Sequence, residues 1–216
     1  MIDKMLELIA ARFPLTEVDA GEYAKLKVSG MNFNIRSFQA EGLGSVSVME
    51  AAGFFGLMNM DTLIITPTAV DMPLYSYDRV HAMGNDTLIF ELYDTLLGHA
   101  DLSMLAGVKR AARKLPDHDL GSHWYDDIKL DVSLSKKGKK KDTPAFDEAA
   151  LDYTRAFLAV AETAEPCDAA PKREKASVYV EGLLTHGGPS TDVFKKGLGE
   201  EKTAELFRKV LFATEV

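Results

Sequence analysis

The sequence has almost no cysteine: Cys167 is the only one among 216 residues. A single thiol forms no intrachain disulfide and provides no multi-cysteine metal site, and such usage fits a reducing compartment. No run of about 18 apolar residues occurs, so no transmembrane helix is predicted. The N-terminal stretch MIDKMLELIAARFP carries acids within its apolar part, unlike a secretory signal. We therefore expect a cytoplasmic protein that does not enter a membrane.

Basic charge is also scarce. Lys and Arg number 25 against 33 Asp and Glu, which gives a net charge of −8. Nucleic acids and anionic membranes are bound by basic surfaces, so neither is an expected partner.

Common catalytic motifs are missing as well: the P-loop GxxxxGKS/T, HExxH and GxSxG do not occur. The five histidines are scattered. His118 and His123 fall in the acidic stretch DHDLGSHWYDD, which we interpret as a solvated turn rather than a metal loop. We predict no metal site.

What is present is an ordinary globular composition, with 46% hydrophobic and 27% charged residues. A chain of this length fits one domain, residues 1–216, and can bury roughly 70% of its unfolded surface.

The hydrophobic periodicity separates strands from helices along the chain. Apolar residues recur at helical spacing over residues 2–13, and then four or five short stretches with a period of two follow between residues 25 and 92. Helical patterns return later, and they are interrupted by one predicted strand. In order, these later segments are a helix over 100–116, a strand over 129–134, a charged loop over 136–141, and helices from 143, over 175–185 and from 200. Such segregation predicts an α+β fold, a three-layer α/β/α sandwich whose central antiparallel meander is covered by helices on both faces.

Polar residues recur within the predicted meander, and burial would force them to find partners. They suit a cavity for a polar ligand if both faces are covered, or a solvated face if one is only partly covered. These residues are Asn32, Asn34, Arg36, Ser45, Ser47 and Asp61.

The basic stretch KKGKKK, residues 136–141, also allows two interpretations. It is either a solvated loop or a docking patch for an acidic protein partner.

Three segments in a consistent order resemble the ferredoxin-dependent bilin reductases. DMPLYSYDRV, residues 71–80, is similar to their LP-(L/M)-FG-x-D-(L/I)-V segment, and a turn and the strand TLIFELYDTL follow it. LPDHDLGSHWYDDIKLDV, residues 115–132, resembles their next loop. STDVFKKGLGEEKTAELFRKVLF, residues 190–212, resembles their final helix. Red chlorophyll catabolite reductase belongs to the same superfamily.

This resemblance implies an α/β/α sandwich with a pocket for a linear tetrapyrrole between the sheet and the C-terminal helices. It implies no metal, no flavin and no bound cofactor. Reduced ferredoxin, an acidic protein, is the implied external electron donor, and carboxylates or a histidine protonate the bilin.

The family's proton donors carry over only in part. Its histidine falls near Ser47 and its glutamate near Asn34 or Ile35, which leaves Asp61 and Asp192 as the candidate catalytic acids. Asp78 also matches a family position, although a structural hydrogen bond explains it equally well.

Basic and polar residues of the meander are the candidate substrate contacts. Arg36 and Arg79 either pair with propionate groups or form surface salt bridges, and Asn34, Ser47 and Glu50 complete the predicted contacts. Burial against an apolar tetrapyrrole would raise a carboxyl pKa and keep the acid protonated.

The sequence leads to three hypotheses for the function. The first is a ferredoxin-dependent reductase of linear tetrapyrroles. The second is a non-catalytic protein of the same fold that binds a tetrapyrrole or another small ligand. The third is an unrelated α+β protein.

Overall fold

The computed structural model describes residues 1–53 and 56–215. Within them, eight strands form one sheet in the order β1-β3-β4-β5-β6-β7-β8, with β2 also paired to β3. Every neighbouring pair is antiparallel. The strands are β1 (Leu15–Val18), β2 (Lys25–Val28), β3 (Met31–Ala40), β4 (Gly44–Gly53), β5 (Met58–Pro67), β6 (Leu74–Ala82), β7 (Asn85–Tyr93) and β8 (Leu134–Lys139).

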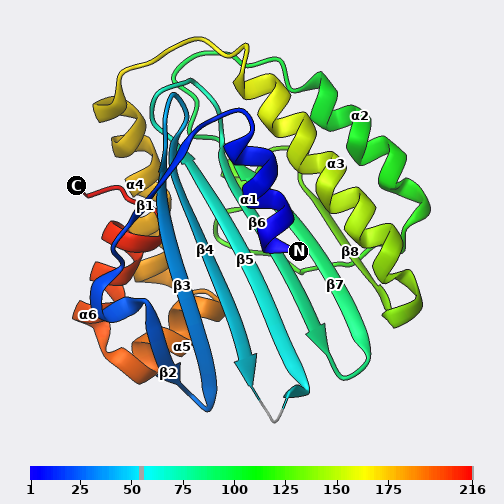
Figure 1. Cartoon of the computed structure of the whole chain (residues 1–216), viewed down its shortest axis with the longest axis vertical. Coiled ribbons are helices and arrows are strands. Elements are labelled where there is room, and N and C mark those ends of the chain that lie inside the picture. Colours follow the sequence, from blue (N-terminus) through cyan, green and yellow to red (C-terminus); the bar gives the residue numbers. More distant parts are fainter. Residues whose placement is uncertain (54–55, 216) are drawn as a thin grey trace.

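Helices cover both faces of this sheet (Figure 1). One face carries α1 (Ile2–Ala10) and α3 (Thr143–Ala161), and α2 (Ser103–Ala111) packs on α3. The other face carries the C-terminal helices, which are α4 (Ala169–His186), α5 (Pro189–Leu198), α6 (Glu200–Glu205) and the π-helical η6 (Leu206–Leu211). Short 3-10 turns are η1 (Gly21–Tyr23), η3 (Ala112–Lys114), η4 (Asp126–Ile128) and η5 (Lys140–Asp142). The predicted three-layer α/β/α sandwich with an antiparallel centre is confirmed.

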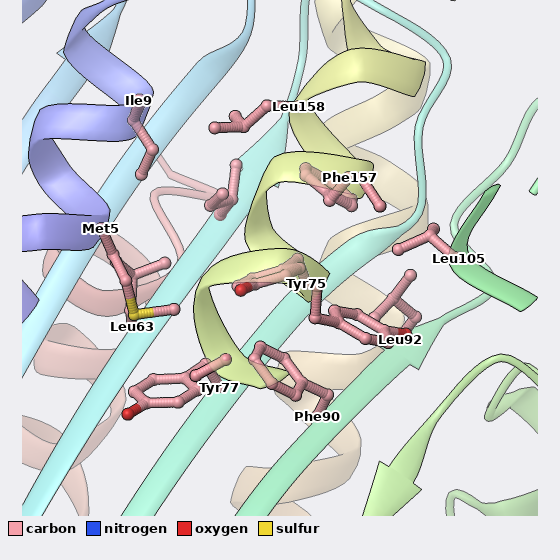
Figure 2. Packing of buried hydrophobic residues seen from close by; sticks show 14 of the residues in the cluster. Met5, Ile9, Leu63, Tyr75, Tyr77, Phe90, Leu92, Leu105, Phe157 and Leu158 are labelled. Carbon is pink, nitrogen blue, oxygen red and sulfur yellow. The ribbon is translucent and has the colours of Figure 1, made fainter. Parts of the chain in front are cut away.

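Each sheet face builds its own hydrophobic core, because successive strand residues point to opposite faces. Toward α1 and α3, the side chains of Leu63, Tyr75 and Tyr77 pack with Met5 and Phe157. Figure 2 shows the two tyrosines projecting from β6 into this core. Toward the C-terminal helices, a second cluster includes Met49, Ile64, Tyr93, Tyr179 and Phe207.

Several local predictions were wrong. No strand was assigned to residues 74–82, which form β6, and the strand predicted at 129–134 begins only at Leu134. Most of the basic stretch therefore lies in β8, the edge strand, where Lys136 is buried and pairs with Asp117. An edge strand tolerates lysines because one side of it meets no other strand.

The π-helical turn of η6 is pinned to the sheet by two buried serines. The hydroxyl of Ser37 donates to the carbonyl of Val210 at 3.0 Å, and that of Ser47 donates to the carbonyl of Leu211 at 2.6 Å. The widened turn is closed by the amide of Phe212, which donates to the carbonyl of Phe207 at 3.0 Å. π-helical turns free carbonyls and are frequent at functional sites. Here, this turn directs aromatic side chains at the sheet.

A membrane span would need a longer and more apolar helix than any that the described part of the chain contains.

Candidate functional site

A cleft of about 230 Å³ lies between the sheet and the C-terminal helices. Its floor is the face of β4 to β7 that carries Met49, Thr62 and Ile64, and its roof comes from α4, α5 and η6. The loop before η4 closes one side, because the indole of Trp124 in that loop donates to the carbonyl of Gly187 at 3.2 Å. The lining is mostly apolar and aromatic, which is typical of a site for an organic ligand.

Asp78 on β6 is the most perturbed acid of the cleft. The hydroxyl of Thr62, directly opposite on β5, donates to its carboxyl at 2.5 Å. Burial, and to a smaller extent the nearby carboxylate of Glu91, raises the pKa of Asp78 to about 6. A carboxyl that keeps its proton near neutral pH can act as a general acid.

Glu91 on β7 is the second carboxyl in the cleft. It faces Ser76 across β6 and β7, so it lies diagonally from Asp78 on the same face of the sheet. The hydroxyl of Tyr93 donates to its Oε2 at 2.7 Å, and the ammonium of Lys129 lies 3.6 Å from its Oε1. Unlike Asp78, Glu91 therefore has a positive partner.

Aromatic rings form the walls around these carboxyls. Tyr93 and Tyr179 are stacked with ring centroids 4.0 Å apart, and His123 is stacked on Tyr125 at 4.8 Å. Burial is the main cause that raises the pKa of the Tyr93, Tyr125 and Tyr179 hydroxyls above their usual value. These phenols therefore remain protonated hydrogen-bond donors that can orient a ligand.

Four residues predicted as site residues lie on the opposite face of the sheet. Asn34, Glu50 and Asp61 border a shallow surface groove beside β2, and Asn34 is exposed. Arg36 pairs with Asp3 at 3.2 Å and with Glu50 at 3.4 Å. Burial, followed by the charge of Glu50, raises the pKa of Asp61. The structure brings these residues near one another but separates them from the cleft.

The other predicted residues also lie away from the cleft lining. Arg79 is buried on the α3 side, where its Nε and Nη2 donate to Asp86 at 2.5 and 2.7 Å. The hydroxyl of Ser47 is occupied by η6, as described above. Asp192 is exposed on α5. Among the polar residues of the predicted meander, Asn32 and Asn34 are exposed. They match the second interpretation, in which this sheet face is only partly covered and is solvated.

The sequence analysis did not identify Glu91 or His123 as site residues and left Asp78 undecided. A usable signal was present: Glu91 is the only acid within the apolar run TLIFELY. A carboxyl in the middle of a strand that is covered on both faces must be paired or functional.

Among residues 1–53 and 56–215, no three His, Cys, Asp or Glu side chains are grouped so as to hold a metal ion.

No family model matches the sequence, and no curated protein matches it. Among solved structures, the chain is similar to phytochromobilin synthase from tomato, which was solved in complex with biliverdin. The two superpose with a TM-score of 0.81 at 16% identity, over 99% of this chain and 82% of the tomato chain. This protein has the phytochromobilin synthase fold. The resemblance found in the sequence is thus confirmed at the level of the fold.

Proposed function

We propose that this protein binds a linear tetrapyrrole, or a similarly conjugated open-chain ligand, in the cleft and reduces it with Asp78 as a proton donor. The observation that carries the proposal is the carboxyl of Asp78, whose pKa is raised, inside an aromatic cleft. Support comes from the fold, because a protein of the same fold was solved with biliverdin.

The reaction would add two electrons and two protons to a conjugated double bond of the ligand. One proton comes from the carboxyl of Asp78, which becomes a carboxylate, and the other comes from solvent. Proton transfer requires the carboxyl to lie within about 3 Å of the accepting carbon or oxygen, directly or through one water. The apolar walls exclude water from the reduced intermediate.

We propose that the electrons come one at a time from two molecules of reduced ferredoxin, each of which is oxidised by one electron. No bound cofactor is then needed. The basic side chains around β8 and α2 suit an acidic donor: Lys137, Lys139, Lys140, Lys141, Arg110 and Arg113. Such local charge steers an acidic partner despite the negative net charge of this chain.

The cleft volume limits how the ligand is held. At about 230 Å³, it is smaller than pockets that enclose drug-sized ligands, which hold about 300–1,000 Å³. We therefore expect the conjugated centre to enter the cleft and the acidic side chains of a bilin to project from its mouth.

The test is an anaerobic absorbance titration with biliverdin, followed by addition of reduced ferredoxin. A red-shifted complex that then bleaches or forms a new band would support the reductase. Asp78→Asn should bind but lose the second step, whereas Asp61→Asn, on the opposite face, should retain both steps. Binding without turnover in the wild type would favour the non-catalytic binding protein. No spectral change at tens of micromolar biliverdin would refute the tetrapyrrole proposal.

A further inference from the structure

Glu91 separates the cleft from a second cavity. This neighbouring cavity, of about 220 Å³, shares Glu91 and Leu120 with the cleft and is otherwise polar, with His118, Asp119 and Lys129 in its wall. It lies between β7, β8 and the loop that precedes η4, and it opens to solvent past the exposed side chain of Asp119. A carboxyl between an apolar cleft and a polar, solvated cavity is placed to exchange protons between them.

The two carboxylate oxygens of Glu91 have different surroundings. Its Oε2 accepts the hydroxyl of Tyr93 at 2.7 Å. Its Oε1 is buried and has no hydrogen-bond donor within the described residues, although the ammonium of Lys129 lies 3.6 Å away. One oxygen is therefore held in place, while the other is free to accept a proton.

Lys129 keeps a positive charge beside this oxygen. Burial acts to lower the pKa of Lys129, but the carboxylates of Asp126 and Glu91 outweigh it, so the pKa is raised. Its Nζ donates to Asp126 at 2.6 Å and lies over the ring of Tyr125, 5.7 Å from its centroid. A charged Lys129 therefore lies beside the oxygen of Glu91 that has no hydrogen-bond donor.

We propose that Glu91 and the second cavity form the route by which Asp78 regains its proton from solvent, with Lys129 as the positioning charge. This inference rests on the proposed function, since only turnover leaves Asp78 without its proton. A buffer acid in solvent loses one proton to Glu91, and Glu91 passes this proton to the carboxylate of Asp78. No electrons move in this step.

The same arrangement separates the roles of the two acids. Asp78 accepts the hydroxyl of Thr62 and takes part in no ion pair within the described residues, whereas Glu91 has the ammonium of Lys129 at 3.6 Å from its Oε1. Other titratable groups that face this pair are Tyr93, Tyr125, Tyr179, His123 and His118. The second cavity holds several waters beside Glu91, since one water needs about 10–15 Å³ of such volume, and Glu91 lies diagonally from Asp78, about 7–8 Å away on the neighbouring strand.

The experiment compares single and repeated turnover of biliverdin by wild type, Glu91→Gln and Lys129→Met. In Glu91→Gln, the first protonation should stay within about twofold of wild type, because Asp78 itself delivers that proton. The steady-state rate should fall by about tenfold to a hundredfold, the range of general acid–base assistance. In Lys129→Met, the alkaline limb of the pH–rate profile should move to higher pH, and Lys129→Arg should restore it.

The outcomes separate this inference from the proposed function. If the wild type does not reduce biliverdin, the proposed function fails, and the relay fails with it. If the wild type turns over and Glu91→Gln has an unchanged steady-state rate, only the relay is refuted. If Glu91→Gln loses its fold, as seen by near-ultraviolet circular dichroism, the pH profiles of the two Lys129 variants decide, and an unmoved alkaline limb overturns the inference.

Discussion

Replacing Asp78 with Asn should make the protein more stable at neutral pH, although it should abolish the proposed reduction. The amide keeps the size of the carboxyl and an oxygen that can accept the Thr62 hydroxyl at 2.5 Å. The substitution removes the ability of this side chain to ionise inside the cleft. The variant therefore isolates the cost of a buried carboxylate.

The magnitude follows from the shift in pKa. Burial raises the pKa of Asp78 from 3.8 to about 6, which is about two units or about 3 kcal/mol. Below pH 3.8, the carboxyl is protonated in the folded and the unfolded protein, so it adds no penalty. As pH rises from 3.8 to the folded pKa of about 6, the unfolded chain ionises while the folded chain keeps its proton, and above that pKa both ionise and the penalty stays constant. The wild type thus loses up to about 3 kcal/mol that Asp78→Asn retains.

The assay is urea unfolding at pH 4.5, 6 and 7.5, with the free energy of unfolding compared between wild type and variant. The difference should grow in favour of Asp78→Asn toward pH 7.5, with a gain in melting temperature of roughly 2–4 °C for each kcal/mol. Asp192→Asn, at an exposed carboxylate of α5, is the matched control and should show no such trend. A difference that stays constant within about 0.5 kcal/mol across this pH range would show that the cleft does not hold Asp78 protonated, and the argument for a general acid would be lost.

Three further predictions concern the scaffold and the electron donor. Arg79→Met should lower the free energy of unfolding by about 3–5 kcal/mol in urea, because it removes the bidentate guanidinium from the buried carboxylate of Asp86; a loss below about 1 kcal/mol would contradict this. Ser47→Ala should cost about 1–3 kcal/mol by leaving a carbonyl of η6 without its donor, and it should weaken biliverdin binding in the same titration; unchanged affinity would show that η6 does not need this anchor. Charge reversal at Lys140 and Lys141 should raise the KM for reduced ferredoxin at low salt and flatten its dependence on ionic strength; an unchanged KM would place the donor elsewhere.

The sequence predicted the layers of this fold better than the position of its site. Segregated strand and helix periods were sufficient for the antiparallel sandwich, because each element must bury its apolar side against another layer. The helix over 2–13 and the C-terminal helices show this directly. Periodicity did not reveal β6, since Tyr75 and Tyr77 alternate with Ser76 and Asp78 for only four residues, and the charged Arg79 then takes the next position on the face of the tyrosines.

The site could not be placed because the period of two does not say which face carries which helices. Asp61 and Asp78 lie on neighbouring strands, but Asp61 is registered opposite Arg79 and Asp78 opposite Thr62. A difference of one position in the strand therefore sends the two aspartates to opposite sides of the sheet. Choosing between them required the docking of η6, which rests on Ser37 and Ser47, long-range contacts that no local pattern encodes.

Asp86 on β7 has a guanidinium beside its carboxylate and Asp78 on β6 has no cation, and this contrast is the strongest argument for a functional cleft. On the α3 side, Asp86 receives the guanidinium of Arg79 in a bidentate pair, and its charge is matched. On the other side, Asp78 receives the hydroxyl of Thr62, and no ion pair involves it in the described part of the chain. The fold can thus supply a cation to an acid on these strands, yet at Asp78 it leaves the carboxyl unpaired with a raised pKa, at a cost in stability. Perturbed acids in clefts concentrate at functional sites, and protonation of a bound ligand is the use that we propose for this one.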